Sequence, residues 1–371
     1  MIKLGSRLLV PGDKLDLPYL DAIARAVRTL RDAGVETVLV SSGAIATGVA
    51  ELGLKDRPRS VARKQAAAAV GQIALMHAYR TAFAENGLEG AQLLLTHADI
   101  EDRKRFLNAR HTLGALIELG VVPLVNENDT VSTEEIRVGD NDNLAAMVAS
   151  LWGADLLVLL SDIDALYTAD PSRDPDAQRI PVVHGITDDL EAMASDVTSG
   201  PGVGGMRTKL QAARRAGELG IPSVIAHGRE PDVVTRVVLD GESVGTRVEP
   251  QRPKRLQQRK HWIGHLLKPR GVLRVDAGAA SAIVDAGKSL LPSGIVEVEG
   301  TFRMGDAVEI RDPEGSCVAR GLVAYDAREL ASLRGRRTDE IEATLGYKYR
   351  DEVVHRDDLV ILSSPNEESH P

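Results

Sequence analysis

The stretch Val121–Leu160, VVPLVNENDTVSTEEIRVGDNDNLAAMVASLWGADLLVLL, contains the strand–loop–helix–strand pattern that decides the fold. Val121–Val125 and Leu156–Leu160 are apolar runs of strand length, and Leu144–Trp152 between them has the pattern of a buried helix. Two strands joined through a helix predict parallel pairing with a right-handed crossover. Because the strands are apolar on both sides, we expect helices to cover both faces of the sheet.

The same alternation of strand and helix patterns extends through residues 1–250. Further strands are predicted at Ile2–Leu4, Thr37–Val40, Gln92–Leu95 and Ser223–Ala226. Further helices are predicted at about Leu20–Leu30, Val61–Ala84, Asp99–Leu119 and Met206–Leu219. The first of these helices has Asp16 as a candidate cap and Gly34 beyond its end. We therefore expect an α/β fold, a three-layer αβα sandwich around a mainly parallel sheet.

The pattern changes after residue 250. Residues 251–271 form a basic linker, since eight Lys or Arg and no acidic residue occur between Arg252 and Arg274. Short strands separated by Gly, Asp and Pro turns then predict a small β-rich domain at 272–355. Residues 356–371 are expected to be a C-terminal strand and a polar tail.

Composition excludes several classes of protein. Of the 371 residues, 43% are apolar and 27% charged, which is typical of a globular protein with a sizeable core. Residues 251–371 contain 19 basic and 19 acidic residues, so the net charge of −9 lies in residues 1–250 and disfavours nucleic-acid binding there. The sequence contains no run of 18 apolar residues, so it predicts no membrane-spanning helix. With Cys317 as its single cysteine, the chain can form no internal disulfide, which fits the cytoplasm.

Ligands bind beyond the carboxyl ends of strands in open parallel sheets. That rule selects the loops at Gly5-Ser6, Ser41–Gly43, Asn126–Asp129 and Ser161-Asp162. Lys3, just before the first loop, can reach a transferring phosphate or can be an ordinary surface lysine. Ser42 and the residues after it can leave helix N–H groups free for an anion or can simply cap the helix.

Two loops are dense in amides and carboxylates, Asn126–Asp129 and Gly139–Asn143. Such side chains can grip both the amino group and the carboxylate of an amino acid. They can also bind a metal through oxygen ligands, or serve only as turn residues.

A glycine-rich segment, Gly200–Gly205, precedes a helix with Thr208 and Lys209 in its first turn. The segment matches the spacing G-x-G-x-x-G, but no strand precedes it, so a dinucleotide site is not expected. It can deliver a lysine to a nucleotide, or it can be a surface loop. The nine histidines show no metal-ligand spacing.

These segments are most specific in combination. Lys3–Ser6, Ser41–Ala46, Phe106–Arg110, Asn126–Asp129, Gly139–Asn143 and Gly204–Lys209 occur in this order. In this combination the chain resembles the amino acid kinase family, and within that family the kinases that act on glutamate. The later segments Asp276–Ala279, Ser289–Gly294 and Phe302–Asp306 resemble the PUA domain appended to many such kinases.

The resemblance implies ATP-dependent phosphorylation of the γ-carboxylate of L-glutamate, the first step of proline biosynthesis. It implies that Lys3 and Lys209 neutralise the phosphoryl group in flight and that Asp142 orients them. Glutamate would be held by Ser42, Asp129 and Asn141, with Asn126 adjacent. ATP would be contacted by Lys3, Ser161, Asp162, Val203, Gly204, Gly205, Met206, Arg207, Thr208 and Lys209. The resemblance also implies Mg²⁺ between the phosphates rather than on protein ligands, proline as a competing inhibitor, and a homo-oligomer.

Two other hypotheses remain open at this stage. A sister kinase, acting on aspartate, acetylglutamate or a nucleotide, would share the lysines but not the Asn126–Asp129 segment or the PUA-like part. An RNA-binding accessory protein would use the PUA-like part, but its zero net charge and few aromatic residues argue against RNA binding.

Overall fold

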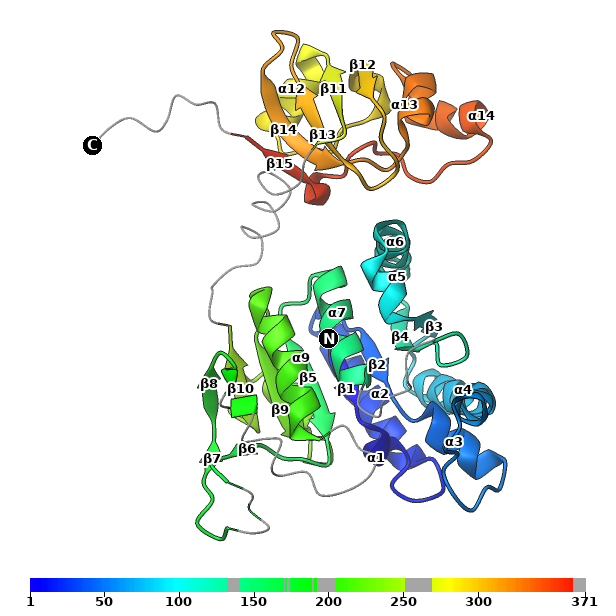
Figure 1. The fold of residues 1–371 in the computed structure, drawn as a ribbon, viewed down its shortest axis with the longest axis vertical. Helices are drawn as coiled ribbons and strands as arrows, with labels where there is room; N and C mark the ends of the chain where they lie inside the picture. The colour runs from blue at the N-terminus through cyan, green and yellow to red at the C-terminus, as the bar shows by residue number, and fades with distance from the viewer. Residues whose placement is uncertain are drawn as a thin grey trace, which may run out of the picture. The chain divides into compact units, whose positions relative to one another are not determined.

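The computed structural model describes residues 1–132, 140–169, 171, 174–188, 190–191, 205–250 and 269–362. Contacts divide the chain into two units, Met1–Pro253 and Lys254–Pro371. Each unit has its own sheet and its own buried core (Figure 1). The domain boundary predicted from the sequence at residue 250 stays a prediction, and truncation of the chain near this residue would test it.

The first unit is built on an eight-stranded sheet in the order β3-β4-β2-β1-β5-β9-β10-β8. Its strands are β1 (Ile2–Leu4), β2 (Leu39–Ser41), β3 (Gly90–Leu95), β4 (Val122–Glu127), β5 (Leu157–Ser161), β8 (Val182–His184), β9 (Ser223–His227) and β10 (Thr246–Glu249). The six strands from β3 to β9 pair in parallel, while β10 pairs antiparallel with β9. β6 (Leu166–Tyr167) and β7 (Arg179–Ile180) form a separate antiparallel pair.

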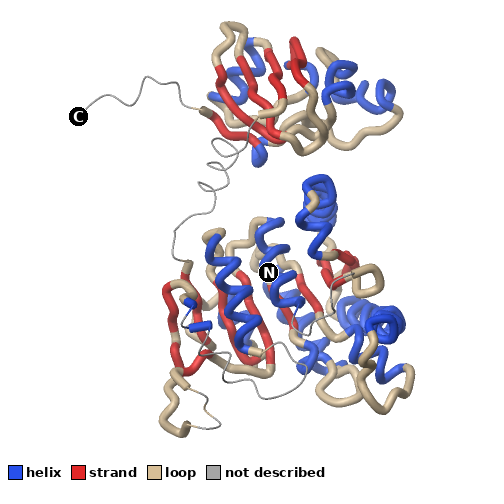
Figure 2. The backbone as a smooth tube through the Cα atoms, viewed as in Figure 1, coloured by secondary structure: helices blue, strands red, loops and turns tan. Residues whose placement is uncertain are grey.

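Helices cover both faces of this sheet, as Figure 2 shows. The helices are α1 (Ser6–Leu9), α2 (Leu17–Asp32), α3 (Ala44–Glu51), α4 (Val61–Glu85), α5 (His97–Glu101), α6 (Arg103–Glu118), α7 (Asp140–Trp152), α9 (Met206–Glu218) and α10 (Val233–Val238). Alternate strand residues enter opposite cores: Ile2 packs with residues of α2, α4 and α10, whereas Val40 and Leu159 pack with residues of α6, α7 and α9. The predicted three-layer α/β sandwich with a mainly parallel sheet is confirmed.

Local sequence signals account for several of these boundaries. Oδ1 of Asp16 accepts a hydrogen bond from the backbone N–H of Tyr19 at 3.0 Å, so it caps α2 as predicted. Gly34 follows that helix with a φ of 76°, a conformation that glycine adopts without strain. The capping residue and the terminal glycine therefore fix both ends of α2.

Two expected elements differ from the structure. The single helix predicted over Asp99–Leu119 is wrong: Asp102 is extended, and its Oδ1 caps a new helix, α6, by accepting from Arg105 N–H at 2.9 Å. The strand predicted at Val121–Val125 continues through Glu127, so Asn126 lies within β4 and not in the loop after it. An aspartate that can cap a helix competes with continuation of the preceding helix, which explains the first difference.

The second unit contains a five-stranded sheet in the order β12-β11-β13-β14-β15. Its strands are β11 (Gly271–Val275), β12 (Ile295–Gly300), β13 (Ala307–Arg311), β14 (Cys317–Leu322) and β15 (Leu359–Ile361). Its helices are α12 (Ala277–Val284), α13 (Ala327–Leu333) and α14 (Ile341–Leu345), with short 3₁₀ turns at Pro292–Gly294, Thr338–Glu340 and Arg356–Asp358. Because β15 pairs with β14, the C-terminal strand belongs to the same sheet as the rest of this unit.

Within the described part of the chain, no helix is both long enough and apolar enough to cross a membrane.

Candidate active site

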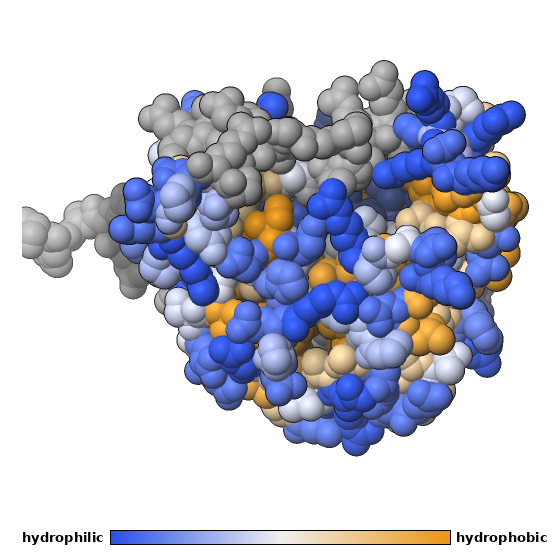
Figure 3. All heavy atoms as spheres, turned by 90° about the horizontal axis from the view of Figure 1, so that it is seen from below, coloured by the Kyte–Doolittle hydropathy of each residue, from blue (hydrophilic) through white to orange (hydrophobic). Residues whose placement is uncertain are grey.

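A pocket of about 350 Å³ lies at the carboxyl ends of the parallel strands in the first unit. It is lined by the four residues that the resemblance assigns to the substrate: Ser42, Asn126, Asp129 and Asn141. Figure 3 views the molecule from below, toward these strand ends, and shows a mostly hydrophilic surface with small hydrophobic patches. Ser42 and Asn141, 99 positions apart, meet here because parallel strands present their carboxyl ends at one edge.

One wall of the pocket is α3, which begins directly after β2. Gly43 makes the turn with a φ of 102°, and no side chain caps the helix that follows. The helix packs very closely against α4, since a Cβ on Gly71 would lie 1.9 Å from the carbonyl oxygen of Ala44. Two glycines at the crossing, Gly48 and Gly71, thus place α3 at the pocket.

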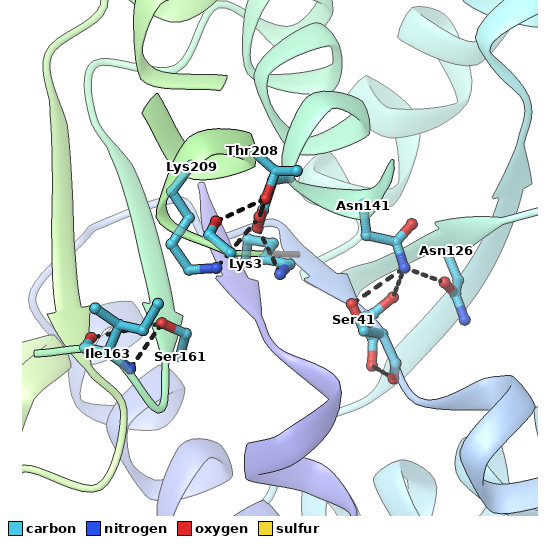
Figure 4. A network of polar contacts seen from close by, with 11 residues as sticks. Lys3, Ser41, Asn126, Asn141, Ser161, Ile163, Thr208 and Lys209 are labelled. Carbon is cyan, nitrogen blue, oxygen red and sulfur yellow. Dashed lines mark hydrogen bonds and ion pairs between the residues drawn. The ribbon is translucent and has the colours of Figure 1, made fainter. Parts of the chain in front are cut away.

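A buried ion cluster lies beside this pocket (Figure 4). Nζ of Lys3 is 2.5 Å from Oδ1 of Asp142, and Nζ of Lys209 is 3.3 Å from Oδ2 of the same carboxylate. Thr208 donates its hydroxyl to Oδ2 of Asp142 at 2.7 Å. Lys3, Asp142 and Lys209 are 4%, 0% and 2% exposed, so one carboxylate holds two ammonium groups out of bulk water.

The pKa values of Asp142 and Lys209 are shifted in this cluster. Burial alone would raise the pKa of Asp142, but Lys3 and Lys209 outweigh it and hold that pKa below its usual value. Burial lowers the pKa of Lys209, with Lys3 acting in the same direction and Asp142 opposing both. Two positive charges against one carboxylate leave the cluster cationic, as a site for phosphate requires.

An amide cluster lies on the other side of the first turn of α7 (Figure 4). Nδ2 of Asn141 donates to the carbonyl of Ser41 at 2.9 Å, to Oδ1 of Asn126 at 3.0 Å and to Oγ of Ser42 at 3.2 Å. Asn141 and Asp142 are consecutive residues, yet one joins the amide cluster and the other joins the ion cluster. The helix α7 thereby connects the pocket with the lysines.

The residues assigned to ATP are only partly brought together. Ser161, at the end of β5, accepts a hydrogen bond from Ile163 N–H at 3.1 Å, and Asp162 pairs with Arg7 at 2.6 Å. Burial tends to raise the pKa of Asp162, but Arg7 and, more weakly, Lys209 bring it below its usual value.

The glycine-rich segment is described only from its last residue. Gly205 precedes α9, Met206 packs in the core and Arg207 is exposed. Val203 and Gly204 lie outside the described residues.

Sequence analysis missed several polar residues of this region. Lys55 and Arg57 line the pocket, and burial lowers the pKa of Arg57 while Asp129 opposes that shift. Glu127 is 7% exposed, with Oε2 3.6 Å from Nδ1 of His97. Gln72 of α4 hydrogen-bonds Asn126. Only Glu127 belongs to a recognisable motif; the others occur in a loop and in an Ala-rich helix without a signal of their own.

Comparison with known proteins places the chain in a family. The model of the amino acid kinase family matches residues 1–227, and the model of the PUA domain matches residues 271–345. The chain therefore belongs to the amino acid kinase family and carries a PUA domain after its kinase part.

Similar proteins extend the match over both units. Glutamate 5-kinase of Myxococcus xanthus is 50% identical over 363 residues, covering 98% of this chain and 96% of its own. Glutamate 5-kinase of Geobacter sulfurreducens is 49% identical over 363 residues, covering 98% of this chain and 97% of its own. Among solved structures, UMP kinase from Bacillus anthracis is 18% identical, with a TM-score of 0.47, covering 68% of this chain and 95% of that one.

Proposed function

We propose that this protein transfers the γ-phosphoryl group of ATP to the γ-carboxylate of L-glutamate, giving L-glutamyl 5-phosphate, the first intermediate of proline biosynthesis. The observation that carries the proposal is the buried Lys3–Asp142–Lys209 cluster next to a pocket lined with amides and a carboxylate. The similarity to glutamate 5-kinases over 98% of the chain supports glutamate as the acceptor.

The chemistry needs few protein groups. An oxygen of the substrate carboxylate forms a bond to the γ-phosphorus while the bond from that phosphorus to the β–γ bridging oxygen breaks, and ADP leaves. The carboxylate is already an anionic nucleophile, so no general base is required. The enzyme must instead bring two anions together and stabilise the charge that spreads over the transferred group. Lys3 and Lys209 supply that positive charge, and Asp142 holds their ammonium groups in place.

We assign glutamate to the pocket side and ATP to the lysine side of α7. Ser42, Asp129, Asn141 and Asn126 would bind glutamate, because all four line the pocket. ATP would lie toward Lys3, Ser161, Asp162 and the segment Val203–Lys209, because both lysines converge on Asp142 and Lys209 also interacts with Asp162. The transferred phosphoryl group would then pass beside Asn141 and Asp142.

Among the described residues, no group of three or more His, Cys, Asp or Glu side chains is placed to hold a metal ion. Asp142, the most buried carboxylate of the site, is engaged by two lysines and a hydroxyl. These residues do not fit a metal held by the protein, so we propose that Mg²⁺ enters on the nucleotide. There it would neutralise phosphate charge.

The experiment is an ADP-release assay with glutamate, aspartate, N-acetylglutamate and UMP as acceptors. Hydroxylamine added to the reaction converts an acyl phosphate into a hydroxamate, so its formation shows that a carboxylate accepted the phosphoryl group. We expect ADP release and hydroxamate with glutamate alone. ADP release with UMP but not glutamate would instead assign the chain to a nucleotide-specific branch of the family.

Four further properties are proposed from the family relationship. Proline would inhibit by occupying part of the glutamate pocket, since it shares the α-carboxylate and the amino nitrogen. The protein would act in the cytoplasm and as a homo-oligomer. The PUA domain would bind RNA weakly at most, because the residues from 251 to 371 carry no net charge.

A further inference from the structure

Three side-chain amides form a continuous hydrogen-bonded chain from α4 to the pocket. We call Gln72, Asn126 and Asn141 the amide relay. Oε1 of Gln72 accepts from Nδ2 of Asn126 at 2.8 Å, and Oδ1 of Asn126 accepts from Nδ2 of Asn141 at 3.0 Å. The relay thus connects helix α4, strand β4 and helix α7.

Backbone groups fix the direction of the relay. The N–H of Glu127 can only donate, and it lies 2.9 Å from Oδ1 of Asn126. The carbonyl of Ser41 can only accept, and it lies 2.9 Å from Nδ2 of Asn141. The orientation of each asparagine amide is therefore fixed by a backbone group that can only donate or only accept a hydrogen bond. Asn126 must direct its NH₂ group toward Gln72, and Asn141 must direct its carbonyl away from Ser41.

The end of the relay at the pocket carries an unused acceptor. Oδ1 of Asn141 is buried and has no hydrogen-bond partner among the described residues, and Asn141 lines the pocket. A buried acceptor without a partner costs about 1–3 kcal/mol, so a ligand that donates a hydrogen bond there binds favourably. The α-ammonium group of an amino acid is such a donor.

Gln72 is not among the residues that line the pocket, so it can act on a ligand there only through Asn126. It supplies the one acceptor that the structure shows for Nδ2 of Asn126. Without that acceptor, the N–H of Glu127 would still hold Oδ1 of Asn126, but the NH₂ group would be left unpaired; the amide would then shift toward another partner and weaken the bond that Oδ1 accepts from Nδ2 of Asn141.

We infer that Gln72 is a positioning residue for substrate binding: through Asn126 it holds Asn141 so that Oδ1 of Asn141 accepts a hydrogen bond from the substrate ammonium. This inference rests on the proposed function, and it adds a residue from a helix that carries none of the kinase motifs. Gln72 touches no reacting atom, so its loss should change ground-state binding of the amino acid and leave the phosphoryl-transfer step intact.

The test is steady-state kinetics of Gln72→Met and Gln72→Glu in the full chain. Methionine keeps the approximate shape but has no oxygen, and we expect the glutamate KM to rise about 10-fold, as leaving one buried polar group unpaired predicts. The kcat and the ATP KM should stay within about twofold, since the lysine cluster is untouched. The Gln72→Glu side chain keeps an oxygen that accepts from Asn126, so this variant should recover most of the affinity for the substrate.

Two comparisons separate positioning from a general structural effect. His77→Leu removes a polar group from an exposed position on the same helix and should leave every kinetic constant unchanged. In an Asn126→Ala background, where nothing is left to position, Gln72→Met should have no further effect on the glutamate KM. This second comparison also tests the positioning role if Gln72→Met alone folds poorly. In the double variant the Asn126 NH₂ group, which Gln72→Met leaves unpaired, is absent.

An unchanged glutamate KM in Gln72→Met, a loss of kcat in place of affinity, or additive effects with Asn126→Ala would each overturn the inference. Failure of the proposed function gives a different result, because the unmodified protein itself would then show no glutamate-dependent ADP release.

Discussion

Lys209 is buried with Nζ 3.3 Å from Oδ2 of Asp142, and the proposed transfer step uses the positive charge of its ammonium group. Replacing Lys209 with alanine removes a group that the proposed mechanism uses as a donor to the transferred phosphoryl group. We expect kcat to fall by about 10²–10³, the usual loss for one such donor, with a much smaller change in the glutamate KM. Steady-state kinetics measure both constants, and near-normal turnover would remove Lys209 from the mechanism.

The control is the pH dependence of kcat, compared between the unmodified protein and Lys209→Arg. Since burial lowers the pKa of Lys209 from its ordinary 10.5, the ammonium group loses its proton at a lower pH than an exposed lysine does. The proposed mechanism uses the protonated form, so kcat should decline as pH rises through this lowered pKa. Arginine does not titrate in this range, and the decline should be absent from the profile of Lys209→Arg.

Asp129 lines the pocket, and we expect its carboxylate to pair with the substrate ammonium as well, a contact made equally in the ground state and the transition state. Asp129→Ala should therefore raise the glutamate KM and leave the ATP KM nearly unchanged. Measuring both constants on the same preparation separates the two sides of the site. A rise in the ATP KM alone would show that glutamate and ATP are assigned to the wrong sides of the site.

Part of the candidate site could be predicted from position in the chain, whereas the roles of Lys3, Asp142 and Lys209 were given only by the resemblance. Ser42 and Asp129 stand just beyond β2 and β4, and the rule about carboxyl ends brings them together without knowledge of the fold in detail. Gln72 could not be found, because its partner Asn126 is 54 residues away and nothing in an Ala-rich helix marks one glutamine. Arg57 was missed because nothing in the loop around it marks one arginine as a pocket residue.

At the scale of elements, the crossing of α3 and α4 sets one wall of the pocket. A Cβ on Gly71 would lie 1.9 Å from the carbonyl oxygen of Ala44 and 2.3 Å from the backbone nitrogen of Gly48. Backbone atoms cannot yield as a flexible side chain does, so Gly71→Ala must move α3. We expect the free energy of unfolding to fall by about 3 kcal/mol, at the upper end for an overpacked core, together with a higher glutamate KM.

Gly217→Ala is the matched control for this change. Gly217 also lies inside a helix, α9, but its nearest non-local atom is Cα of Pro250 at 3.7 Å. The alanine side chain fits there, and its better helix propensity should stabilise the protein by up to about 1 kcal/mol. Equal stability losses in the two variants by denaturant unfolding would contradict a steric role for the α3–α4 crossing.

The elements that sequence analysis predicted well are those with a single dominant signal. The helix α2 has a capping aspartate, apolar residues at helical spacing and a terminal glycine, and the prediction is confirmed. The break between α5 and α6 has competing signals, since Thr96 caps the first helix in a capping box while Asp102 caps the second. Strand β4 runs past its apolar part because Asn126 and Glu127 continue to pair with β3.

At the scale of the whole molecule, the change from alternating strands and helices to short strands predicted a second part, and the structure has a separate β-sheet there. All residues assigned to the site precede residue 210, within the span matched by the amino acid kinase family. The described part of the second unit has its own buried core, which includes Leu273, Val308 and Tyr325. Each unit thus has the core that independent folding requires.

Truncation after Pro253 tests this division. We expect the shortened protein to unfold cooperatively and to release ADP in the presence of glutamate, because its sheet, its core and its lysine cluster are all retained. Cooperative folding without activity would show that the second unit supports catalysis or assembly.

The isolated second unit is tested separately, by titration with RNA at low and at physiological salt. Any attraction must come from the seven basic residues between Lys254 and Arg274 that this unit retains, so binding should be weak and should fall steeply with added salt. Tight binding that resists salt would instead require a built RNA site and would restore the RNA-binding hypothesis for this unit.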